Sequence, residues 1–565
     1  MVALGRNYLH LKAMFWLVAV VLGALQAWDA RHSMNPDGIS YLDIGDAYFR
    51  GDWNVAINAY WSPFYSWLLG LAMVFLKPSP YWEFSVVHLV NFIIYLFALG
   101  CFHFFLLELI SYNREKKAGF SADRSADLPE WACLALGYTL FIWSSLELIS
   151  ISVVTPDMCV AAFVYSAAGI LLRIRRGSAS WLTFVLLGLV LGIGYLAKAA
   201  MFPLAFVFLG VGMFSVGNLR RAVPRVLLAL VVFLLVGGPF IVALSQVKGR
   251  LTFGDSGKLN YAWHVNRADI DRVHQEGGSF DSIPRYRMER LSTAPAIYSF
   301  GTPDKITYPL WYDPSDRYRG TETHFDPRAQ IRVLVSTAKN YFQIFFHLQN
   351  GLVFGFLILY FMGRRRWFCV MDMLDHSTLL IPAIAALAMY SLIFVLPRYV
   401  APFVVLLWLG VASGVRLPDS QESRRLVASV IIAMMVTILV PILEKAYPLA
   451  RNLTMIEDPS AHPHWQVADS LNRMGAQPGD KVAYIGFARL AAWARLARVQ
   501  IVAEIRKDER LYFWEADSLV KSRVIKTFAT TGAKIIVAEE VPNYISTNGW
   551  QAIGNTGIYV YVLPR

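Results

Sequence analysis

Charged residues are scarce in this sequence. Only 16% of its 565 residues are Asp, Glu, Lys or Arg, whereas 56% are hydrophobic and 14% are aromatic. A soluble globular domain carries about 25% charged residues, so the composition excludes that class. Many apolar runs reach the roughly 17 to 25 residues that span a bilayer as a helix. The composition therefore predicts an integral membrane protein.

Cysteine is also scarce, and its spacing is irregular. The four cysteines lie in or beside apolar runs without forming a closely spaced pair: Cys101, Cys133, Cys159 and Cys369. This pattern indicates neither a disulfide framework nor a Cys-based metal site. His88, His103 and His347 lie within apolar segments and lack an H-x-x-x-H spacing, so we expect packed side chains there rather than zinc ligands.

Positive charge is present as short clusters. The net charge is +12, and Lys and Arg gather between apolar runs at 173–176, 220–225 and 364–366. Such clusters are typical of cytoplasmic loops. The positive charge therefore indicates the orientation of the protein in the membrane and argues against a nucleic-acid partner. The first apolar segment, 11–28, is followed by a sequence that resembles a signal-peptide cleavage site, but we favour an uncleaved first helix.

The basic clusters also constrain the number of membrane crossings. Hydropathy suggests about twelve apolar segments, but an odd number must precede the polar loop 246–335 if that loop lies outside. The weakest candidate is 62–76, whose length of about fifteen residues reaches only ~22 Å of a ~30 Å hydrocarbon core. We expect this segment to lie along the membrane surface. About eleven crossings remain, and the C-terminus is predicted to be outside.

The predicted fold class is an α-helical polytopic membrane protein with a small extracytoplasmic C-terminal α/β domain. Residues 1–245 would form a seven-helix module, which includes a first outer loop at 31–84 with juxtamembrane helices near 40–50 and 62–76. A large outer loop and four further helices would follow, at 246–335 and 336–446. From 447 to 565, short β-branched runs alternate with helical stretches, which favours an α/β domain. That domain has no G-x-G-x-x-G motif or P-loop, so nucleotide binding is not indicated.

Acidic residues gather directly after the first apolar segment. Four acids and four aromatics fall within 35–53, and a carboxylate at the edge of a bilayer is costly to desolvate. We predict that Asp37 is a catalytic base, with helix capping as the alternative. Asp43 and Asp46 fit a solvated helix face, on which Asp46 and Arg50 form an i,i+4 pair, and receive no catalytic role.

Three further polar sites are predicted on the same outer face. Asp157 follows Thr-Pro at a helix start, where capping and a contact to an acceptor are equally good explanations. Lys198 and Arg398 lie at two other outer turns, where the positive-inside rule makes basic residues rare. Long basic side chains also snorkel to headgroups, but an acid with two cations suits the transfer of a group from a lipid phosphate.

The large outer loop is rich in aromatic residues. Tyr308, Trp311 and Tyr312 lie together in the segment 308–314. Aromatic rings stack on sugars and also anchor loops at the depth of lipid headgroups. These residues could therefore form a substrate loop or an interfacial belt, and the sequence does not decide between the two. Its length favours a loop that gates a cleft.

Short motifs resemble those of the GT-C superfamily of polyprenyl-phosphate-sugar glycosyltransferases, in the branch of lipid A aminoarabinose transferases and protein O-mannosyltransferases. P-D-G-I-S-Y resembles the D-E-x-x-Y segment of that family, with Asp37 and Tyr41 at the Asp and Tyr positions. G-I-G-Y-L-A-K resembles G-L-G-x-L-T-K and ends at Lys198. Arg398 and Tyr399, followed by Pro402, resemble R-Y-x-x-P.

The resemblance implies roles for these residues. Asp37 would be the base, Lys198, Arg398 and Tyr399 would bind the donor phosphate, and Asp157 and Tyr41 would contact the acceptor or a metal. The family's Glu is replaced by Gly38, and the family's basic residue on the second juxtamembrane helix is absent from Y-W-S-P-F-Y. This pattern requires no cofactor, and it leaves a divalent cation open.

The sequence thus predicts a transferase that moves a sugar from a polyprenyl-phosphate carrier to a hydroxyl of a glycan, lipid or protein. It would act on the outer, periplasmic face of a bacterial-type inner membrane, invert the anomeric centre and bind no nucleic acid. One alternative is a polymerase or ligase that uses a diphosphate-linked glycan, which Arg285, Arg287 and Arg290 in the outer loop keep open. The others are a lipid or sugar transporter, although no internal repeat is seen, and a membrane-anchored module that binds a partner.

Overall fold

A computed structural model describes residues 8–119, 125–268, 288–301, 305–317, 322–347, 349–362, 375–418, 420–452 and 462–564. The chain divides into two compact units. The helical unit comprises Met1–Ala30, His88–Ala268 and Thr323–Thr454. The mixed unit comprises Arg31–Val87, Asp269–Glu322 and Met455–Arg565. Each unit therefore contains segments that are far apart in the sequence.

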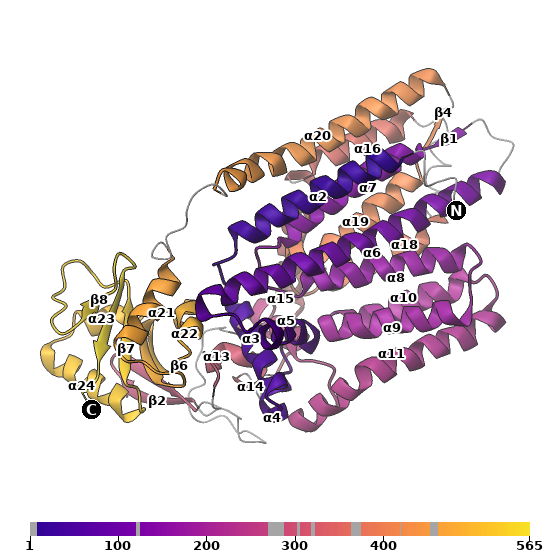
Figure 1. Cartoon of the computed structure of the whole chain (residues 1–565). Helices are drawn as coiled ribbons and strands as arrows, with labels where there is room; N and C mark the ends of the chain where they lie inside the picture. Colours follow the sequence, from indigo (N-terminus) through magenta and orange to yellow (C-terminus); the bar gives the residue numbers. More distant parts are fainter. Residues whose placement is uncertain are drawn as a thin grey trace. The chain divides into compact units, whose positions relative to one another are not determined.

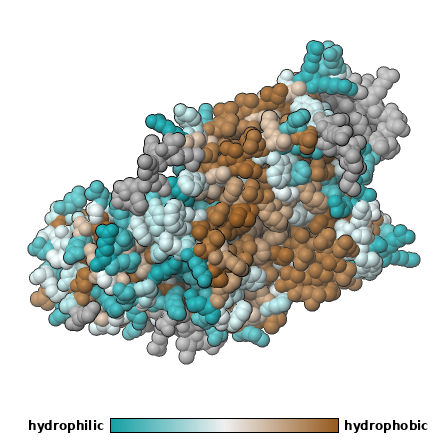
Figure 2. Space-filling model, viewed as in Figure 1, coloured by the Kyte–Doolittle hydropathy of each residue, from teal (hydrophilic) through white to brown (hydrophobic). Residues whose placement is uncertain are grey.

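The helical unit is built from long apolar helices that run alongside one another (Figure 1). Its principal helices are α2 (Leu9–Asp29), α6 (Glu83–Gly119), α7 (Glu130–Trp143), α8 (Asp157–Arg175), α9 (Trp181–Ala197), α10 (Met201–Ser215), α11 (Leu219–Lys248), α12 (Ser256–His264), α15 (Pro327–Phe342), α16 (Asn350–Met362), α18 (Ser377–Ser391), α19 (Pro397–Ser413) and α20 (Gln421–Asn452). α7 and α8 are almost entirely buried, whereas α11 exposes leucines such as Leu235. Figure 2 shows apolar surface gathered over these helices, as expected for helices that face lipid.

Membrane-spanning character is clear for part of this set. Among the described residues, six helices are long and apolar enough to cross a membrane, or up to seven if Pro327–Phe346 and Asn350–Phe361 form one broken span. Five more apolar helices are shorter, and one of these is Pro63–Leu76, the segment predicted to lie along the surface. The molecule is thus an integral membrane protein, and the count of about eleven crossings stays a prediction.

The mixed unit contains a seven-stranded sheet with the order β2-β3-β6-β5-β7-β9-β8. The strands are β2 (Met288–Thr293), β3 (Ala296–Phe300), β5 (Lys481–Gly486), β6 (Gln500–Arg506), β7 (Ile535–Glu539), β8 (Gln551–Ala552) and β9 (Ile558–Val562). β5 is parallel to both of its neighbours, β6 and β7, and the other pairs are antiparallel. The predicted C-terminal α/β domain is therefore confirmed as a fold.

The sheet extends beyond the predicted C-terminal domain. β2 and β3 come from the segment predicted to be a large outer loop separate from that domain, and β3 pairs with β6 through Tyr298–Glu504 and Ser299–Ala503. The sequence of β2, Met-Glu-Arg-Leu-Ser-Thr, is polar and half-exposed because β2 lies at the edge of the sheet. An edge strand of this kind looks like a loop in a hydropathy profile.

Two helices within residues 31–84 form a tightly packed pair, close to the positions predicted for two helices there, and their place beside the membrane stays a prediction. α3 (Pro36–Phe49) and α5 (Pro63–Leu76) both begin with proline at the first helical position, where its fixed φ favours helix entry. They pack through Gly45 and Gly70, since a Cβ on Gly45 would lie 2.6 Å from the Ser66 carbonyl oxygen. Glycine at these positions lets the two backbones approach closely.

A buried ionic cluster is centred on Arg495 of α22 (Ala492–Leu496). The guanidinium lies 2.7 Å from Asp43, 2.7 Å from Asp46 and 2.6 Å from Glu83. Asp43 is 2% exposed and Glu83 is fully buried, so the expectation of a solvated face fails for Asp43. Asp46 pairs with Arg495 and not with Arg50, because Arg495 reaches it from a distant part of the chain.

The cluster also fixes the segment before α13 (Pro309–Tyr312). Asp43 accepts hydrogen bonds from the backbone N–H and the hydroxyl of Thr307, at 2.8 and 3.0 Å. Burial raises the pKa of Asp43, and the ion pair with Arg495 only partly opposes this effect. Burial lowers the pKa of Arg495, but the three carboxylates outweigh burial and hold it above its ordinary value. The guanidinium therefore stays charged and compensates the buried acids.

We expect Arg495→Met to destabilise the fold by about 3 to 5 kcal/mol, because it leaves buried carboxylates without their counter-ion. Thermal unfolding of the purified protein measures the loss. Arg473→Met is the matched control, since Arg473 forms an exposed i,i+4 pair with Asp469. It should change stability by less than about 0.5 kcal/mol.

The deficit of Arg495→Met should also depend on pH. Without the guanidinium, the already raised pKa of Asp43 rises further, so the folded variant binds a proton more readily than the unfolded chain does. The deficit should therefore shrink as the pH falls from neutral toward that raised pKa. A deficit that is constant or grows on acidification would contradict the assignment.

Candidate functional site

Asp37 lies in the first turn of α3, in the mixed unit. It follows Pro36, and the N-cap residue is Asn35, so Asp37 is not itself the cap. Its carboxylate oxygen Oδ1 accepts a hydrogen bond from the indole N–H of Trp311 at 3.0 Å. An acid in this turn is favoured by the helix dipole, which accounts for its presence but not for its contact with Trp311. The structure thus joins two residues that the sequence singled out separately.

Trp311 is held in place through its backbone. Its carbonyl oxygen accepts hydrogen bonds from the Ser40 hydroxyl at 2.9 Å and from the Trp61 indole at 3.2 Å. The next residue, Tyr312, is 1% exposed, and its hydroxyl donates to the Val55 carbonyl at 2.7 Å. These hydrogen bonds hold α13 in place against α3. Tyr312 contributes to the packing of α13, whereas Trp311 contacts Asp37.

Tyr41 packs on the inner side of α3. It is 4% exposed, and its ring meets those of Trp61 and Tyr65 edge to face, with centroids 5.1 Å apart in both cases. Such aromatic pairs stabilise packing beyond the area that they bury. The structure places Tyr41 in this aromatic cluster one turn after Asp37.

A cavity of about 480 Å³ is lined by Trp311 together with residues of the C-terminal domain. The Arg489 guanidinium lies 4.6 Å from the centre of the Trp311 ring, in a cation–π arrangement. The Tyr308 hydroxyl donates to the buried carboxylate of Glu504 at 3.1 Å. Arg506 also lines the cavity. Aromatic rings, guanidinium groups and a carboxylate suit a polar or anionic ligand such as a sugar phosphate.

Arg489 and Arg506 were not singled out in the sequence. They lie far from Asp37 along the chain, Arg489 shortly after β5 and Arg506 at the end of β6, and no motif marks them. Only the sheet, which brings α13 against the ends of β5 and β6, reveals their position at this cavity.

A second group of predicted residues meets within the helical unit. Asp157 is the first residue of α8, Lys198 directly follows α9, and Arg398 and Tyr399 lie in the first turn of α19. Lys198 Nζ lies 2.5 Å from Asp157 Oδ1, and Arg398 Nε lies 3.4 Å from Asp157 Oδ2. The Lys198 ammonium also lies 3.6 Å from the centre of the Tyr399 ring. The structure thus brings three turns predicted on one face into a single cluster.

This cluster carries an excess of positive charge. Asp157 is 3% exposed and is shared by two cations, whose side chains are 22% and 21% exposed. Because both cations are partly exposed, an anion can reach them. Asp157 orients both of them. No group of three or more His, Cys, Asp or Glu that could hold a metal ion is found in the described part of the chain.

Solved structures of known proteins resemble this chain in fold. No protein-family model matches it, and no curated protein matches its sequence. Among solved structures, ArnT from Cupriavidus metallidurans bound to undecaprenyl phosphate is similar, with a TM-score of 0.51, 13% identity and 97% of each chain covered. The apo oligosaccharyltransferase from Archaeoglobus fulgidus has a TM-score of 0.51 and 12% identity, with 94% of this chain and 70% of that chain covered.

These similarities span nearly the whole chain at low identity. They show that the chain has the GT-C fold, as the resemblance of its motifs predicted. The fold leaves the roles of individual residues to be tested, because function lies in the site and not in the fold.

A double-mutant cycle on Asp157→Asn and Lys198→Met should give a coupling free energy of about 1 to 3 kcal/mol, since the pair is partly buried. Thermal unfolding of the four proteins measures it. The exposed pair of Lys445 and Glu147 in the same unit is the control, with an expected coupling below about 1 kcal/mol. Additive effects at Asp157 and Lys198 would show that the ion pair contributes nothing to the fold.

Proposed function

We propose that this GT-C-fold protein is a membrane glycosyltransferase that takes a sugar from a polyprenyl-phosphate carrier and gives it to a hydroxyl group. The observation that carries the proposal is the Asp157, Lys198 and Arg398 cluster, which holds two cations at helix ends in a partly exposed position. A similar structure, that of ArnT, is described with bound undecaprenyl phosphate.

In this proposal Lys198 and Arg398 bind the donor phosphate. As the bond between the anomeric carbon and the phosphate oxygen breaks, negative charge gathers on the departing lipid phosphate. Cationic groups held in place before the reaction stabilise that charge without reorganisation. Tyr399 packs against both cations and limits where their side chains point. Asp157, predicted as an acceptor or metal contact, acts in the proposal by positioning the two cations.

Asp37 is proposed as the general base. The acceptor hydroxyl is a poor nucleophile, and a carboxylate that takes its proton as the anomeric carbon is attacked lowers the barrier. The acceptor oxygen forms the new bond while the phosphate leaves from the opposite side, so the anomeric centre is inverted. The hydrogen bond from Trp311 holds the carboxylate in one orientation. Trp311 and Tyr308 would line the path of the acceptor.

The acceptor, whether a glycan, a lipid or a protein, is left open by the proposal, and so is a divalent cation. Activity on the periplasmic face of an inner membrane likewise remains part of the proposal. The alternative that uses a diphosphate-linked glycan depended on basic residues of the outer loop. Arg285 and Arg287 lie outside the described residues, and Arg290 donates to backbone carbonyls of its own hairpin. That alternative therefore gains no support from Arg290.

Replacement of the proposed base should abolish most turnover. Asp37→Asn keeps the size of the side chain but cannot accept the proton, so we expect kcat to fall about 10²- to 10⁴-fold. Transfer of radiolabelled sugar from a panel of polyprenyl-phosphate donors by the purified protein measures this. Asp52→Asn, a neighbouring loop acid, is the control and should retain turnover. Full turnover by Asp37→Asn would move the base elsewhere.

Replacement of a proposed phosphate contact should affect the donor instead. Lys198→Met removes a charged hydrogen bond, so we expect KM for the donor to rise about tenfold or more, with a smaller fall in kcat. Lys198→Arg keeps the charge and should recover part of the affinity. An unchanged kcat/KM for the donor in Lys198→Met would remove Lys198 from the donor site.

A further inference from the structure

The cavity beside Trp311 lies at the edge of the sheet where α/β folds commonly bind ligands. β5 is parallel to β6 and to β7, so these three strands have their carboxyl ends at the same edge. Residues 486–490 and 506–508, at and directly after the ends of β5 and β6, contribute to the lining of the cavity. The chain passes from β5 to β6 on one side and later reaches β7 on the other. Such a reversal of strand order opens a crevice at the carboxyl edge, which is the usual ligand site of these sheets.

The loop after β5 is fixed to the end of β7. Glu539, the last residue of β7, accepts hydrogen bonds from the Phe487 backbone N–H and from the Tyr484 hydroxyl, the latter at 2.8 Å. Gly486 has a φ of 142°, and a Cβ at this position would collide with the Glu539 side chain. Glycine is therefore required for the chain to leave β5 in this direction. The backbone that carries Arg489 is thus held in place before a ligand binds.

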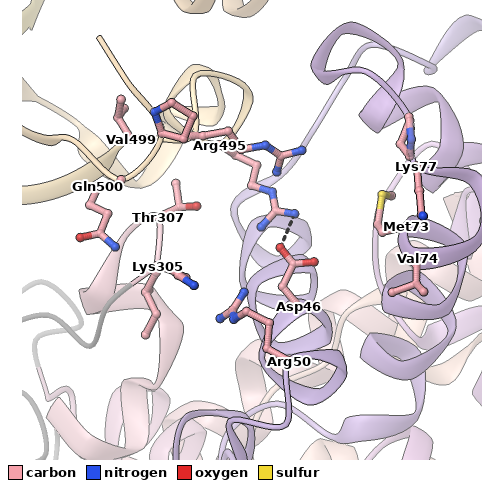
Figure 3. Close-up of a pocket in the computed structure, with 15 residues that line it drawn as sticks. Asp46, Arg50, Met73, Val74, Lys77, Lys305, Thr307, Arg495, Val499 and Gln500 are labelled. Atoms are coloured by element: carbon pink, nitrogen blue, oxygen red, sulfur yellow. Dashed lines mark ion pairs between the residues drawn. The ribbon is translucent and has the colours of Figure 1, made fainter.

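Arg489 presents a guanidinium without an acceptor to this cavity. Its Cζ lies 4.6 Å from the centre of the Trp311 ring and 4.9 Å from the centre of the Phe487 ring. These rings provide no oxygen or nitrogen acceptor for the N–H groups. Within the described part of the chain, no hydrogen bond or ion pair joins Arg489 to an acceptor, whereas Arg495 is directed at the Asp46 carboxylate (Figure 3). Five N–H donors in a rigid fork favour a carboxylate or a phosphate as the ligand.

The net charge of the lining distinguishes between these two anions. Arg506 Nε lies 3.5 Å from Asp508 Oδ1, and Lys507 Nζ lies 3.5 Å from Glu540 Oε1, so both of these cations are paired within the protein. Three cations and two carboxylates line the cavity, which leaves an excess of one positive charge. A carboxylate carries one negative charge at neutral pH, whereas a phosphate monoester carries about 1.5 to 2. The charge of the cavity therefore favours a carboxylate.

Glu504 gives the cavity a buried hydrogen-bond acceptor. It is 4% exposed and interrupts an otherwise apolar stretch of β6, residues 501–505. Packing alone favours an apolar residue here, because a buried carboxylate loses its hydration. Its Oε2 accepts a hydrogen bond from the Tyr308 hydroxyl at 3.1 Å. A carboxylate can accept from more than one donor, and the hydroxyl groups of a sugar are suitable donors. A ligand with both a carboxylate and hydroxyl groups can therefore use Arg489 and Glu504 together.

We propose that the cavity beside Trp311 binds a uronate, a sugar with a carboxylate group, within an acceptor glycan. Arg489 binds the carboxylate, and Glu504 accepts a hydrogen bond from a hydroxyl group of the same sugar. The cavity volume of about 480 Å³ falls within the roughly 300 to 1,000 Å³ typical of small-ligand sites. Trp311 joins the cavity to the proposed base, since its ring contacts Arg489 and its indole N–H donates to Asp37. The inference rests on the proposed function and narrows its acceptor to an acidic glycan.

Binding in the absence of a donor tests the cavity apart from the reaction. Trisaccharides of galacturonate, glucuronate or mannuronate are titrated into the full-length protein in detergent and followed by calorimetry. We expect at least one of them to bind, and its methyl ester, which has the same rings and no charge, to bind at least about tenfold more weakly. Arg489→Met keeps an apolar contact with the two rings and removes the charge. Its affinity for the acid should fall about tenfold or more, at a nearly unchanged melting temperature.

Two control variants assign the effect to Arg489. Arg489→Lys keeps the charge but not the planar fork, so it should recover only part of the affinity. Arg50→Met removes an exposed cation that lines a different cavity of the mixed unit, the one in Figure 3. This variant should bind the acidic trisaccharide as the wild type does.

Transfer assays separate this inference from the proposed function. With a saturating polyprenyl-phosphate donor, Arg489→Met should raise KM for the acidic acceptor about tenfold or more, with a smaller change in kcat and an unchanged KM for the donor. Binding that depends on Arg489 without transfer from any donor would support the uronate site and refute both the proposed function and the acceptor role. Transfer to neutral acceptors without binding of any acidic trisaccharide would refute the uronate site alone.

Three further results would overturn the inference. The first is equal binding of the acidic trisaccharide by Arg489→Met and the wild type, or equal binding of the acid and its methyl ester. The second is binding of an aspartate tripeptide as tightly as the trisaccharide, which would show that a peptide carboxylate is sufficient. The third is tighter binding of galactose 6-phosphate than of galacturonate, which would assign the cavity to a phosphate.

Discussion

The burial of Arg495 is the constraint on which the mixed unit depends. A guanidinium with almost no access to water must be surrounded by acceptors, and three carboxylates from α3 and the start of α6 surround it. Asp43 in turn fixes Thr307. Because α13 follows Thr307 closely, the same cluster helps determine where Trp311 stands beside Asp37. A structural ion cluster and a proposed catalytic carboxylate are thus joined by one short segment.

The sequence was informative where local pattern and burial agree. Apolar runs predicted the membrane helices, and short β-branched runs within 447–565 predicted the C-terminal α/β domain, which contains β5, β6, β7 and β9. The motifs around Asp37, Lys198 and Arg398 predicted the GT-C fold. What periodicity could not show was long-range pairing. Asp43 looks like any acid on a helix surface, and only the approach of Arg495, more than four hundred residues later, makes it a buried charge.

The candidate sites also differ in whether local sequence pattern could predict them. Asp157, Lys198 and Arg398 lie at helix ends, where topology alone places them on one face, so their meeting could be expected. The aromatic and basic cavity beside Trp311 could not, because Arg489 and Arg506 reach it only through the order of strands in the sheet.

The hairpin of β2 and β3 gives the C-terminal domain an unusual dependence on the rest of the chain. Its two strands are translated before the last helices of the helical unit, such as α18, α19 and α20, and must later cover the edge of β6. Closing so long a loop costs little more than closing a moderate one, because the entropy grows only logarithmically with length. A fragment cut to contain only the last part of the chain, however, would expose the backbone donors and acceptors of β6 as a bare edge. The C-terminal domain is therefore not an independent folding unit. A protein that contains this domain alone would also have to include the hairpin of β2 and β3.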